Sequence, residues 1–240
     1  MGWIKLCLLL FFTNLCYANN ITAKSWLVTD ENGNELASDN THQIRPIASI
    51  TKLITVITVL DSNANLDQQL DTKEFGTISR RSLIAIAMVK SNNEAATLLC
   101  KTYPSGYRQC IKDMNGKVQS LGMNDTKLVE PSGLNKRNVS TAEDLVKLVK
   151  ASREYSDIIT TSQYSNIEIN IRRKWVVIKN TNPLIGHNHK IMVSKTGWHR
   201  HAGGCIVMYL NTEKGPRIVV VLGSTSPKTR IPEAEFISTM

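Results

Sequence analysis

The stretch Ser49-Ile50-Thr51-Lys52 decides the fold, because it opens a long apolar run and places a hydroxyl and an amine three residues apart. Isoleucine, leucine and valine recur at helical spacing over residues 48–60, which predicts a helix. At the start of a helix, this spacing sets Lys52 one turn above Ser49 on the same face. A serine hydroxyl becomes a good nucleophile only when a base lies within hydrogen-bond distance. The stretch therefore predicts a serine nucleophile with a lysine base, at a helix N-terminus whose dipole favours negative charge.

Two further short motifs follow this stretch along the chain. Ser91-Asn92-Asn93 lies at a predicted corner between two helices, and Lys195-Thr196-Gly197 follows a β-branched strand. Taken singly, each match is weak, because asparagine is common in ordinary turns and glycine often ends a strand. Their joint occurrence on a helix start, a helix corner and a strand indicates one active site, that of a serine acyl-transfer enzyme.

The residue types in the motifs suggest their roles. Lys52 accepts a proton near neutral pH only if its pKa is lowered, and we expect burial and the second cation Lys195 to lower it. The Ser91 hydroxyl can relay a proton between Lys52 and a leaving amine, while Asn93 can hold a substrate amide or fix Lys52. Gly197 lets a substrate backbone approach the strand closely, so that the lysine and threonine before it face the substrate carboxylate.

Strand patterns lie at both ends of the chain, and helix patterns lie between them. An opening hairpin is predicted over residues 25–37, around a turn at 31–34. Ser140-Thr141-Ala142-Glu143 has the pattern of a capping box and predicts a helix that runs to about residue 152. The other predicted helices are 82–89, 94–99 and 107–121, and the other predicted strands are 167–171, 175–179, 191–194, 202–210 and 217–223.

This order of elements predicts an α+β fold. We expect an antiparallel five-stranded sheet flanked by helices, in which the first hairpin pairs with the last strands and a mainly helical lobe is inserted. A length of 240 residues suits one domain of two lobes, with the active site in the cleft between them.

The chain carries a formal net charge of +9, with its charges scattered along the sequence. Only Arg80-Arg81 and Arg172-Arg173-Lys174 form clusters, and no stretch interleaves aromatic residues with arginines as RNA-binding segments do. We therefore expect no nucleic-acid partner. The positive charge either attracts an anionic polymer or belongs to an ordinary solvated surface.

The first eighteen residues have the pattern of a secretory signal peptide. Lys5 supplies the positive charge, residues 6–15 form an apolar run too short to span a bilayer, and Cys16-Tyr17-Ala18 offers small residues for cleavage. We expect residues 1–18 to be removed and residues 19–240 to form the exported catalytic domain, periplasmic or otherwise outside the cytoplasm. No later stretch reads as a stable membrane anchor, the C-terminal ten residues included.

Export changes the interpretation of the cysteines. Cys100 and Cys110 flank the turn Tyr103-Pro104-Ser105-Gly106, which can bring them together in an oxidising compartment. They are interpreted either as a disulfide or as two reduced thiols. Cys205 lies in an apolar strand and is expected in the core.

Longer stretches around the three motifs resemble the low-molecular-mass penicillin-binding proteins, the D-alanyl-D-alanine carboxypeptidases and endopeptidases of the β-lactamase-like superfamily. The similarity spans residues 25–230 and is strongest to the endopeptidases, which lack the extra C-terminal β domain of many carboxypeptidases. The stretches that carry it besides Ser49-Ile50-Thr51-Lys52 are Lys90-Ser91-Asn92-Asn93-Glu94-Ala95-Ala96, Glu130-Pro131-Ser132-Gly133-Leu134, Asn138-Val139-Ser140-Thr141-Ala142-Glu143-Asp144-Leu145, Asn180-Thr181-Asn182 and Ser194-Lys195-Thr196-Gly197.

The resemblance implies that Ser49 is the nucleophile, Lys52 the general base and Ser91 the proton relay. The backbone N–H groups of Ser49 and Trp198 would form the oxyanion hole. The residues that it assigns to substrate binding are Asn93, Lys195, Thr196, Gly197, Trp198 and Arg230. Arg230 is matched over a short, gapped stretch, and Arg200 is its rival by proximity. Because only ten residues follow Arg230, we expect the closing helix of the family to be short or missing.

The function that the resemblance implies is that of a serine D,D-peptidase acting on peptidoglycan. It would cleave the D-Ala-containing cross-link through an acyl-enzyme on Ser49, with β-lactam antibiotics as covalent inhibitors and with no cofactor. The alternative is a carboxypeptidase that trims terminal D-Ala. A class A β-lactamase is less favoured, because three residues rather than two separate Glu130 from Leu134 in the echo of its E-x-x-L-N signature. A non-catalytic peptidoglycan-binding protein is also less favoured, because all three motifs keep the residues that catalysis needs.

Four histidines flank the third motif, namely His187, His189, His199 and His201. Alternate residues on a strand point the same way, so the two pairs suggest a metal site. No carboxylate or cysteine at ligand spacing accompanies them, and we expect no metal.

Overall fold

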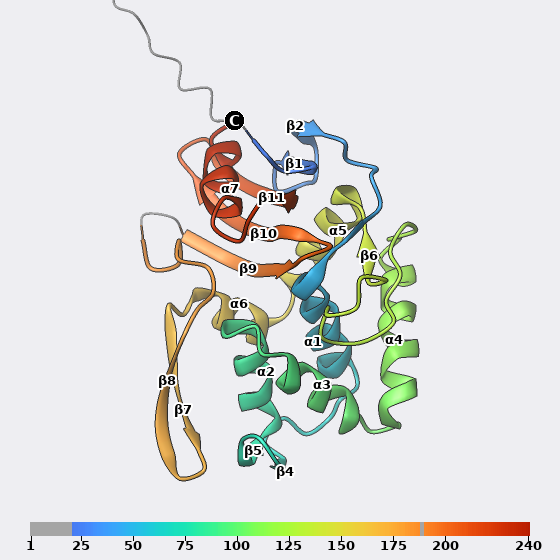
Figure 1. The fold of residues 1–240 in the computed structure, drawn as a ribbon, viewed down its shortest axis with the longest axis vertical. Helices are drawn as coiled ribbons and strands as arrows, with labels where there is room; N and C mark the ends of the chain where they lie inside the picture. Colours follow the sequence, from blue (N-terminus) through green and yellow to red (C-terminus); the bar gives the residue numbers. More distant parts are fainter. Residues whose placement is uncertain (1–20, 188–189) are drawn as a thin grey trace, which may run out of the picture.

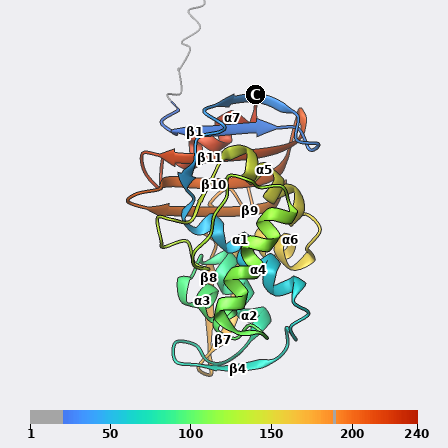
Figure 2. The same ribbon diagram turned by 90° about the vertical axis from the view of Figure 1, so that its right-hand side faces the viewer.

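A five-stranded antiparallel sheet organises the molecule, in the order β2-β1-β11-β10-β9. The computed structural model describes residues 21–187 and 190–240, so the predicted signal peptide and His189 lie outside the described residues. Figure 2 shows the five strands stacked above the helical lobe, with β9 nearest to it. The strands of this sheet are β1 (Ser25–Thr29), β2 (Glu35–Asp39), β9 (Lys190–His199), β10 (Gly203–Thr212) and β11 (Gly215–Ser224).

The register confirms that the first hairpin pairs with the last strands. Leu27 on β1 lies opposite Val220 on β11, and Lys195 on β9 lies opposite Val207 on β10. Strand β9 is paired on one side only, so it forms an edge of the sheet.

The helical segments fill the rest of the chain, and three short strand pairs lie among them. The helices are η1 (Ala48–Ile50), α1 (Thr51–Asp61), α2 (Arg80–Val89), α3 (Asn93–Lys101), α4 (Gly106–Ser120), α5 (Ala142–Ser152), α6 (Ser156–Gln163) and α7 (Arg230–Ser238). The strand pairs are β3 (Arg45–Pro46) with β6 (Val139–Ser140), β4 (Gln69–Thr72) with β5 (Gly76–Ser79), and β7 (Asn166–Ile171) with β8 (Lys174–Lys179).

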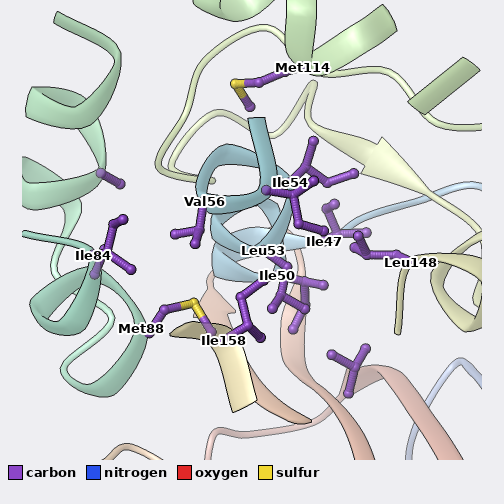
Figure 3. Packing of buried hydrophobic residues seen from close by; sticks show 14 of the residues in the cluster. Ile47, Ile50, Leu53, Ile54, Val56, Ile84, Met88, Met114, Leu148 and Ile158 are labelled. Atoms are coloured by element: carbon purple, nitrogen blue, oxygen red, sulfur yellow. The ribbon is translucent and has the colours of Figure 1, made fainter. Parts of the chain in front are cut away.

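Helix α1 is the centre of the helical lobe. Its apolar side chains from Leu53 to Val59 are fully buried, and Figure 3 shows Met114 of α4, Ile84 and Met88 of α2, Leu148 of α5 and Ile158 of α6 around it. Burying each large aliphatic side chain stabilises the fold by about 2 kcal/mol. The helix that carries Lys52 and follows directly after Ser49 is therefore held firmly by its neighbours, as a site that needs fixed geometry requires.

The two faces of the sheet pack against different helices. Alternate strand residues such as Val207 and Val220 join the core shared with α1 and α5, whereas Met208 and Val219 join a second core with α7. Figure 1 shows α5 and α7 on opposite sides of the sheet. Helix α7 decides between the two expectations for the closing helix: it is not missing, and it is short, at nine residues. It forms because Ala234 and Ile237 have an apolar sheet face to cover.

Three details of the local structure bear on the expectations, and the burial of Cys205 confirms one of them. The N-cap of α5 is Thr141, whose hydroxyl accepts the backbone N–H of Asp144, and not Ser140 as the capping-box pattern predicted. A disulfide joins Cys100 at the end of α3 to Cys110 in α4. Cys205 is buried in the core. Among the described residues, no helix is long and apolar enough to cross a membrane.

Candidate active site

The first motif forms the turn that leads into α1. Ser49 lies in the short helix η1, and Lys52 lies in the first turn of α1 with its side chain fully buried. The Nζ atom of Lys52 lies 2.8 Å from Ser49 Oγ, 2.8 Å from Asn93 Oδ1 and 2.5 Å from the carbonyl oxygen of Ser132. Two of these three contacts hold the amine in place, and the third directs it at the serine hydroxyl.

Burial gives this lysine the pKa that a base needs. Desolvation lowers the pKa of Lys52 to about 7, and the negative charge of Glu130 opposes the shift. Lys52 thus exchanges its proton near neutral pH. We expected a second cation to lower the pKa of Lys52, but this effect falls on Lys195 instead. The pKa of Lys195 lies well below its usual value, mainly because the side chain is buried and further because Lys52 and Arg230 repel its positive charge.

The second motif sits at the corner between α2 and α3. Ser91 has a φ of 57°, a conformation uncommon for a residue with a side chain, and it accepts a hydrogen bond of 2.7 Å from Lys195 Nζ. Asn92 caps α3 by accepting the N–H of Ala95. Asn93 follows directly, and its side chain reaches Lys52. One corner thus contacts both lysines.

Two glycines let three chain segments meet at Ser49. A Cβ atom on Gly197 of β9 would lie 2.8 Å from the backbone nitrogen of Ser49. A Cβ atom on Gly133 would lie 2.0 Å from the carbonyl oxygen of Ala48, and Gly133 also has a φ of +85°. No other residue type fits this approach at either position without a shift of the backbone. Strand β9 and the loop at 130–135 therefore lie directly against the turn that carries Ser49.

The third motif is held from both sides. The Thr196 hydroxyl donates to the hydroxyl of Thr181, and Arg230 at the start of α7 donates from Nη1 to the carbonyl oxygen of Gly197, over 2.7 and 2.6 Å. The structure therefore brings Arg230, 33 residues away in the chain, to the strand that bears the motif. The rival Arg200 is exposed, just after the end of β9. Trp198 is half exposed at the same end of β9.

Sequence reasoning missed the part played by Glu130. Its carboxylate accepts the backbone N–H groups of Ser132 and Gly133 and a side-chain N–H of Asn138, at 2.7, 2.6 and 3.0 Å. These bonds shape the loop so that the carbonyl group of Ser132 faces Lys52. The stretch Glu130-Pro131-Ser132-Gly133-Leu134 was recognised as part of the family resemblance, but the only role considered for Glu130 itself was that of a hydrolytic base. Its oxygens are occupied by the loop that it folds.

His199 and His201 do not alternate along one strand, as the metal hypothesis for them assumed. Strand β9 ends at His199, and His201 lies in the turn that follows. The Nδ1 atom of His199 accepts the backbone N–H groups of His201 and Ala202. Across residues 21–187 and 190–240, no group of three or more histidine, cysteine, aspartate or glutamate side chains is placed to hold a metal ion.

A buried lysine beside a serine at a helix start, next to an edge strand that bears Lys-Thr-Gly, defines a class of serine peptidases with a lysine base. The comparisons agree with this class. Residues 13–74 and 67–226 match the family model described as D-alanyl-D-alanine carboxypeptidase, peptidase family S11. The chain belongs to this family.

Curated relatives give a finer comparison. The chain is 36% identical to a D-alanyl-D-alanine endopeptidase of Escherichia coli, over 91% of this chain and 77% of the relative. It is 38% identical to a protein of the same description from Pseudomonas aeruginosa, over 89% of this chain and 75% of the relative. A carboxypeptidase, DacF of Bacillus subtilis, is 23% identical over 85% of this chain and 58% of that protein.

Solved structures share the fold. Penicillin-binding protein D2 from Listeria monocytogenes, in its cefotaxime-bound form, superposes with a TM-score of 0.83 at 26% identity, covering 91% of this chain and 96% of that chain. The Streptomyces K15 DD-transpeptidase superposes with a TM-score of 0.83 at 25% identity, with the same coverage. The chain is thus a low-molecular-mass penicillin-binding protein by family and by fold.

Proposed function

We propose that this protein is a D,D-endopeptidase that cleaves the D-Ala-containing cross-link of peptidoglycan through an acyl-enzyme on Ser49. The observation that carries the proposal is the contact between Lys52 and Ser49, because a buried amine with a pKa of about 7 lies 2.8 Å from the hydroxyl that it must deprotonate. Removal of that proton by a positioned base contributes about 10²–10⁴-fold to the rate of such a step.

In the acylation step, the neutral amine of Lys52 takes the hydroxyl proton while Ser49 Oγ bonds to the D-Ala carbonyl carbon. The backbone N–H groups of Ser49 and Trp198 stabilise the oxyanion. When the peptide C–N bond breaks, the proton taken up by Lys52 passes through the Ser91 hydroxyl to the leaving amine. Water then attacks the ester carbon, Lys52 takes a proton from it, and Ser49 Oγ receives that proton as the ester C–O bond breaks and the peptide leaves as a carboxylic acid.

The substrate carboxylate would bind beside β9. Lys195 and Thr196 lie on that strand, and Arg230 is fixed to it through Gly197. Lys195 has burial and two neighbouring cations against its charge, so an arriving carboxylate would favour its protonated form. Asn93 would hold the substrate amide in addition to its contact with Lys52.

The choice of endopeptidase over carboxypeptidase rests on the relatives. Three proteins called D-alanyl-D-alanine endopeptidase match at 35–38% identity, whereas the two called carboxypeptidase match at 23 and 28%. A cross-link is a more crowded substrate than a chain end, because the leaving amine belongs to a second peptide.

Location and inhibition follow from the same function. We propose that residues 1–18 direct export and are removed, and that residues 19–240 act in the periplasm or an equivalent compartment. β-Lactams would acylate Ser49, in line with the cefotaxime- and ampicillin-bound forms of the Listeria protein.

The decisive experiment compares the purified protein with a Ser49→Ala variant during incubation with a fluorescent penicillin. We expect a stable covalent label on the parent protein and none on the variant. Absence of label on both proteins would overturn the acyl-enzyme, and rapid loss of label with drug hydrolysis would indicate a β-lactamase. A purified cross-linked peptide dimer and a pentapeptide ending in D-Ala-D-Ala, assayed side by side, then separate the two peptidase activities.

A further inference from the structure

The β7–β8 hairpin presents a face that the active site does not use. Figure 1 shows it extending away from the sheet, past α2 and towards the end of the molecule where β4 and β5 lie. One side of the hairpin packs inward through the buried Ile169 and Ile178. On the opposite side, Trp175 is 73% exposed and Val177 is 57% exposed.

The outer face mixes apolar and polar side chains in a fixed order. Cross-strand partners share a face, so Trp175 stands beside Asn170, Val177 beside Glu168, and Lys179 beside Asn166. A face that entered a bilayer would have to bury this carboxylate and these amides. A flat aromatic surface bordered by amides and a carboxylate is instead suited to a sugar ring, whose C–H face stacks on the indole while its hydroxyls bond to the polar groups.

The tip of the hairpin carries two arginines whose backbone conformation is strained. Arg172 and Arg173 form the two-residue turn with φ of 51° and 64°, positions at which asparagine and glycine are preferred. Holding such residues in the left-handed region costs about 1 kcal/mol each. Together with Lys174 and Lys179, they outnumber the hairpin's one acidic residue, Glu168.

The basic side chains of the hairpin are not neutralised by carboxylates of the described residues. Arg172 donates to the backbone carbonyl group of Lys73, which leaves its positive charge uncompensated. Among the described residues, Arg173, Lys174 and Lys179 have no carboxylate within ion-pair distance. An acidic polymer would complement this end of the hairpin.

The base of the hairpin is continuous with the candidate active site. Strand β8 ends at Lys179, and two residues later Thr181 bonds through its hydroxyl to Thr196 and through its N–H to the carbonyl group of Val89. Trp175 lies about 13 Å along the strand from Lys179. A polymer whose cross-link sits at Ser49 can therefore run along the hairpin.

We propose that the outer face of β7–β8, centred on Trp175, binds a stretch of the substrate polymer away from the scissile bond, a glycan that carries acidic peptides. This inference rests on the proposed function. It assigns the hairpin a role in holding polymeric substrate, separate from the chemistry at Ser49.

The test uses insoluble peptidoglycan in a pelleting assay, with two hairpin variants and two matched controls. Trp175→Ser removes the indole. Arg172→Asn with Arg173→Gly removes two charges and supplies the residues that the turn prefers, so the hairpin keeps or gains stability. Leu36→Ser, on the far edge strand β2, matches the loss of an exposed apolar side chain, and Arg108→Asn with Lys112→Asn, on α4, matches the loss of two charges.

We expect each hairpin variant to bind insoluble peptidoglycan about five- to tenfold more weakly, the effect of losing one aromatic contact or a charge pair. Hydrolysis of the insoluble polymer falls in step, whereas penicillin labelling and cleavage of a small soluble peptide dimer stay unchanged. If the hairpin variants bound peptidoglycan as well as the controls, the proposal would be overturned. It would also be overturned if cleavage of the soluble dimer fell as much as hydrolysis of the insoluble polymer. If the hairpin variants lost binding to phosphatidylglycerol vesicles but kept binding to the polymer, the hairpin would be a membrane contact and not a polymer-binding site. A parent protein without penicillin label would refute the proposed function alone, since pelleting is measured independently.

Discussion

Lys52 and Lys195 carry the proposed chemistry of this site, and both are almost fully buried. Among the described residues, neither lysine forms an ion pair with a carboxylate. Burying an unpaired ammonium group is costly, so the protein favours the neutral amine at both positions. An amine kept neutral by its surroundings is a base without needing a histidine.

The first prediction concerns the pH dependence of acylation. Because the pKa of Lys52 is about 7, the rate of penicillin labelling should rise with pH through neutrality and level off above it. Lys52→Arg should lower the rate by about 100-fold or more, because a guanidinium does not give up its proton. Stopped labelling reactions over pH 5–9 measure both effects. A pH-independent rate, in a parent protein shown to be folded by circular dichroism, would contradict the assignment of Lys52 as the base.

The second prediction concerns the approach of β9 to Ser49. Gly197→Ala places a methyl group 2.8 Å from the Ser49 nitrogen and must move the strand or the helix start. A displacement of that size should reduce acylation by about 100-fold. Gly116→Ala in α4 is the matched control, since nothing lies within 4 Å of its added methyl group. Equal labelling rates for the two variants would show that the close approach is not needed.

At the scale of elements, the sequence predicts helices and strands whose apolar residues recur at regular spacing and misses a short helix without such spacing. The first hairpin, the helix that begins after Pro46 and the strand that bears Lys195 were found from periodicity and turn residues, and the structure confirms them. The short helix α6 was missed, because its Asp-Ile-Ile-Thr-Thr-Ser pattern has little helical periodicity.

The same limit applies to the candidate site. The three motifs could be found because hydroxyl, amine and glycine at fixed spacing restrict the chemistry. Glu130 could not be assigned in this way, because its role lies in backbone N–H groups that only the folded loop turns towards it. The link between Arg230 and Gly197 depends on how α7 packs on the sheet, which no local pattern encodes.

The third prediction tests the loop that Glu130 organises. The charge of Glu130 raises the pKa of Lys52 against the effect of burial, so Glu130→Gln should shift the midpoint of the acylation profile to lower pH. The maximal rate should also fall, because an amide cannot accept all the N–H groups that the carboxylate accepts. The full labelling profile of the variant measures both quantities. A midpoint that stays in place or moves to higher pH would contradict this account.

The fourth prediction concerns the link between α3 and α4. The disulfide closes a loop with a sequence separation of ten residues, and the chain-entropy model gives it about 3 kcal/mol of stability. Cys100→Ala with Cys110→Ala should therefore lower the midpoint of thermal unfolding while leaving the labelling rate at low temperature unchanged. Reduction of the parent protein with a small thiol provides an independent control. A labelling rate that falls with the bridge would tie the link to the site itself.

At the scale of the whole molecule, the site exists only where the two lobes meet. Ser49 of η1 and Lys52 of α1 belong to the helical lobe, whereas Lys195 and Gly197 belong to the sheet, and Arg230 ties α7 to the same strand. The amines of Lys52 and Lys195 are thereby enclosed between two cores, so the packing of the fold and the lowered pKa of the base have one physical cause.

The fifth prediction follows from this shared cause. The folded protein holds Lys52 with a pKa of about 7, against 10.5 for the free side chain, so between these values the unfolded chain binds more protons. Stability must then rise with pH, and from pH 7 to 8.5 this one lysine contributes an increase of about 2 kcal/mol, with Lys195 acting in the same direction. The window stops there because burial raises the pKa of Cys205 to about 11, which favours unfolding once free thiols ionise. Urea unfolding across this range measures the slope, and Lys52→Met should reduce it. A stability that is flat or falls over this interval would mean that the lysine is charged in the folded protein, and with that the base for Ser49 would be lost.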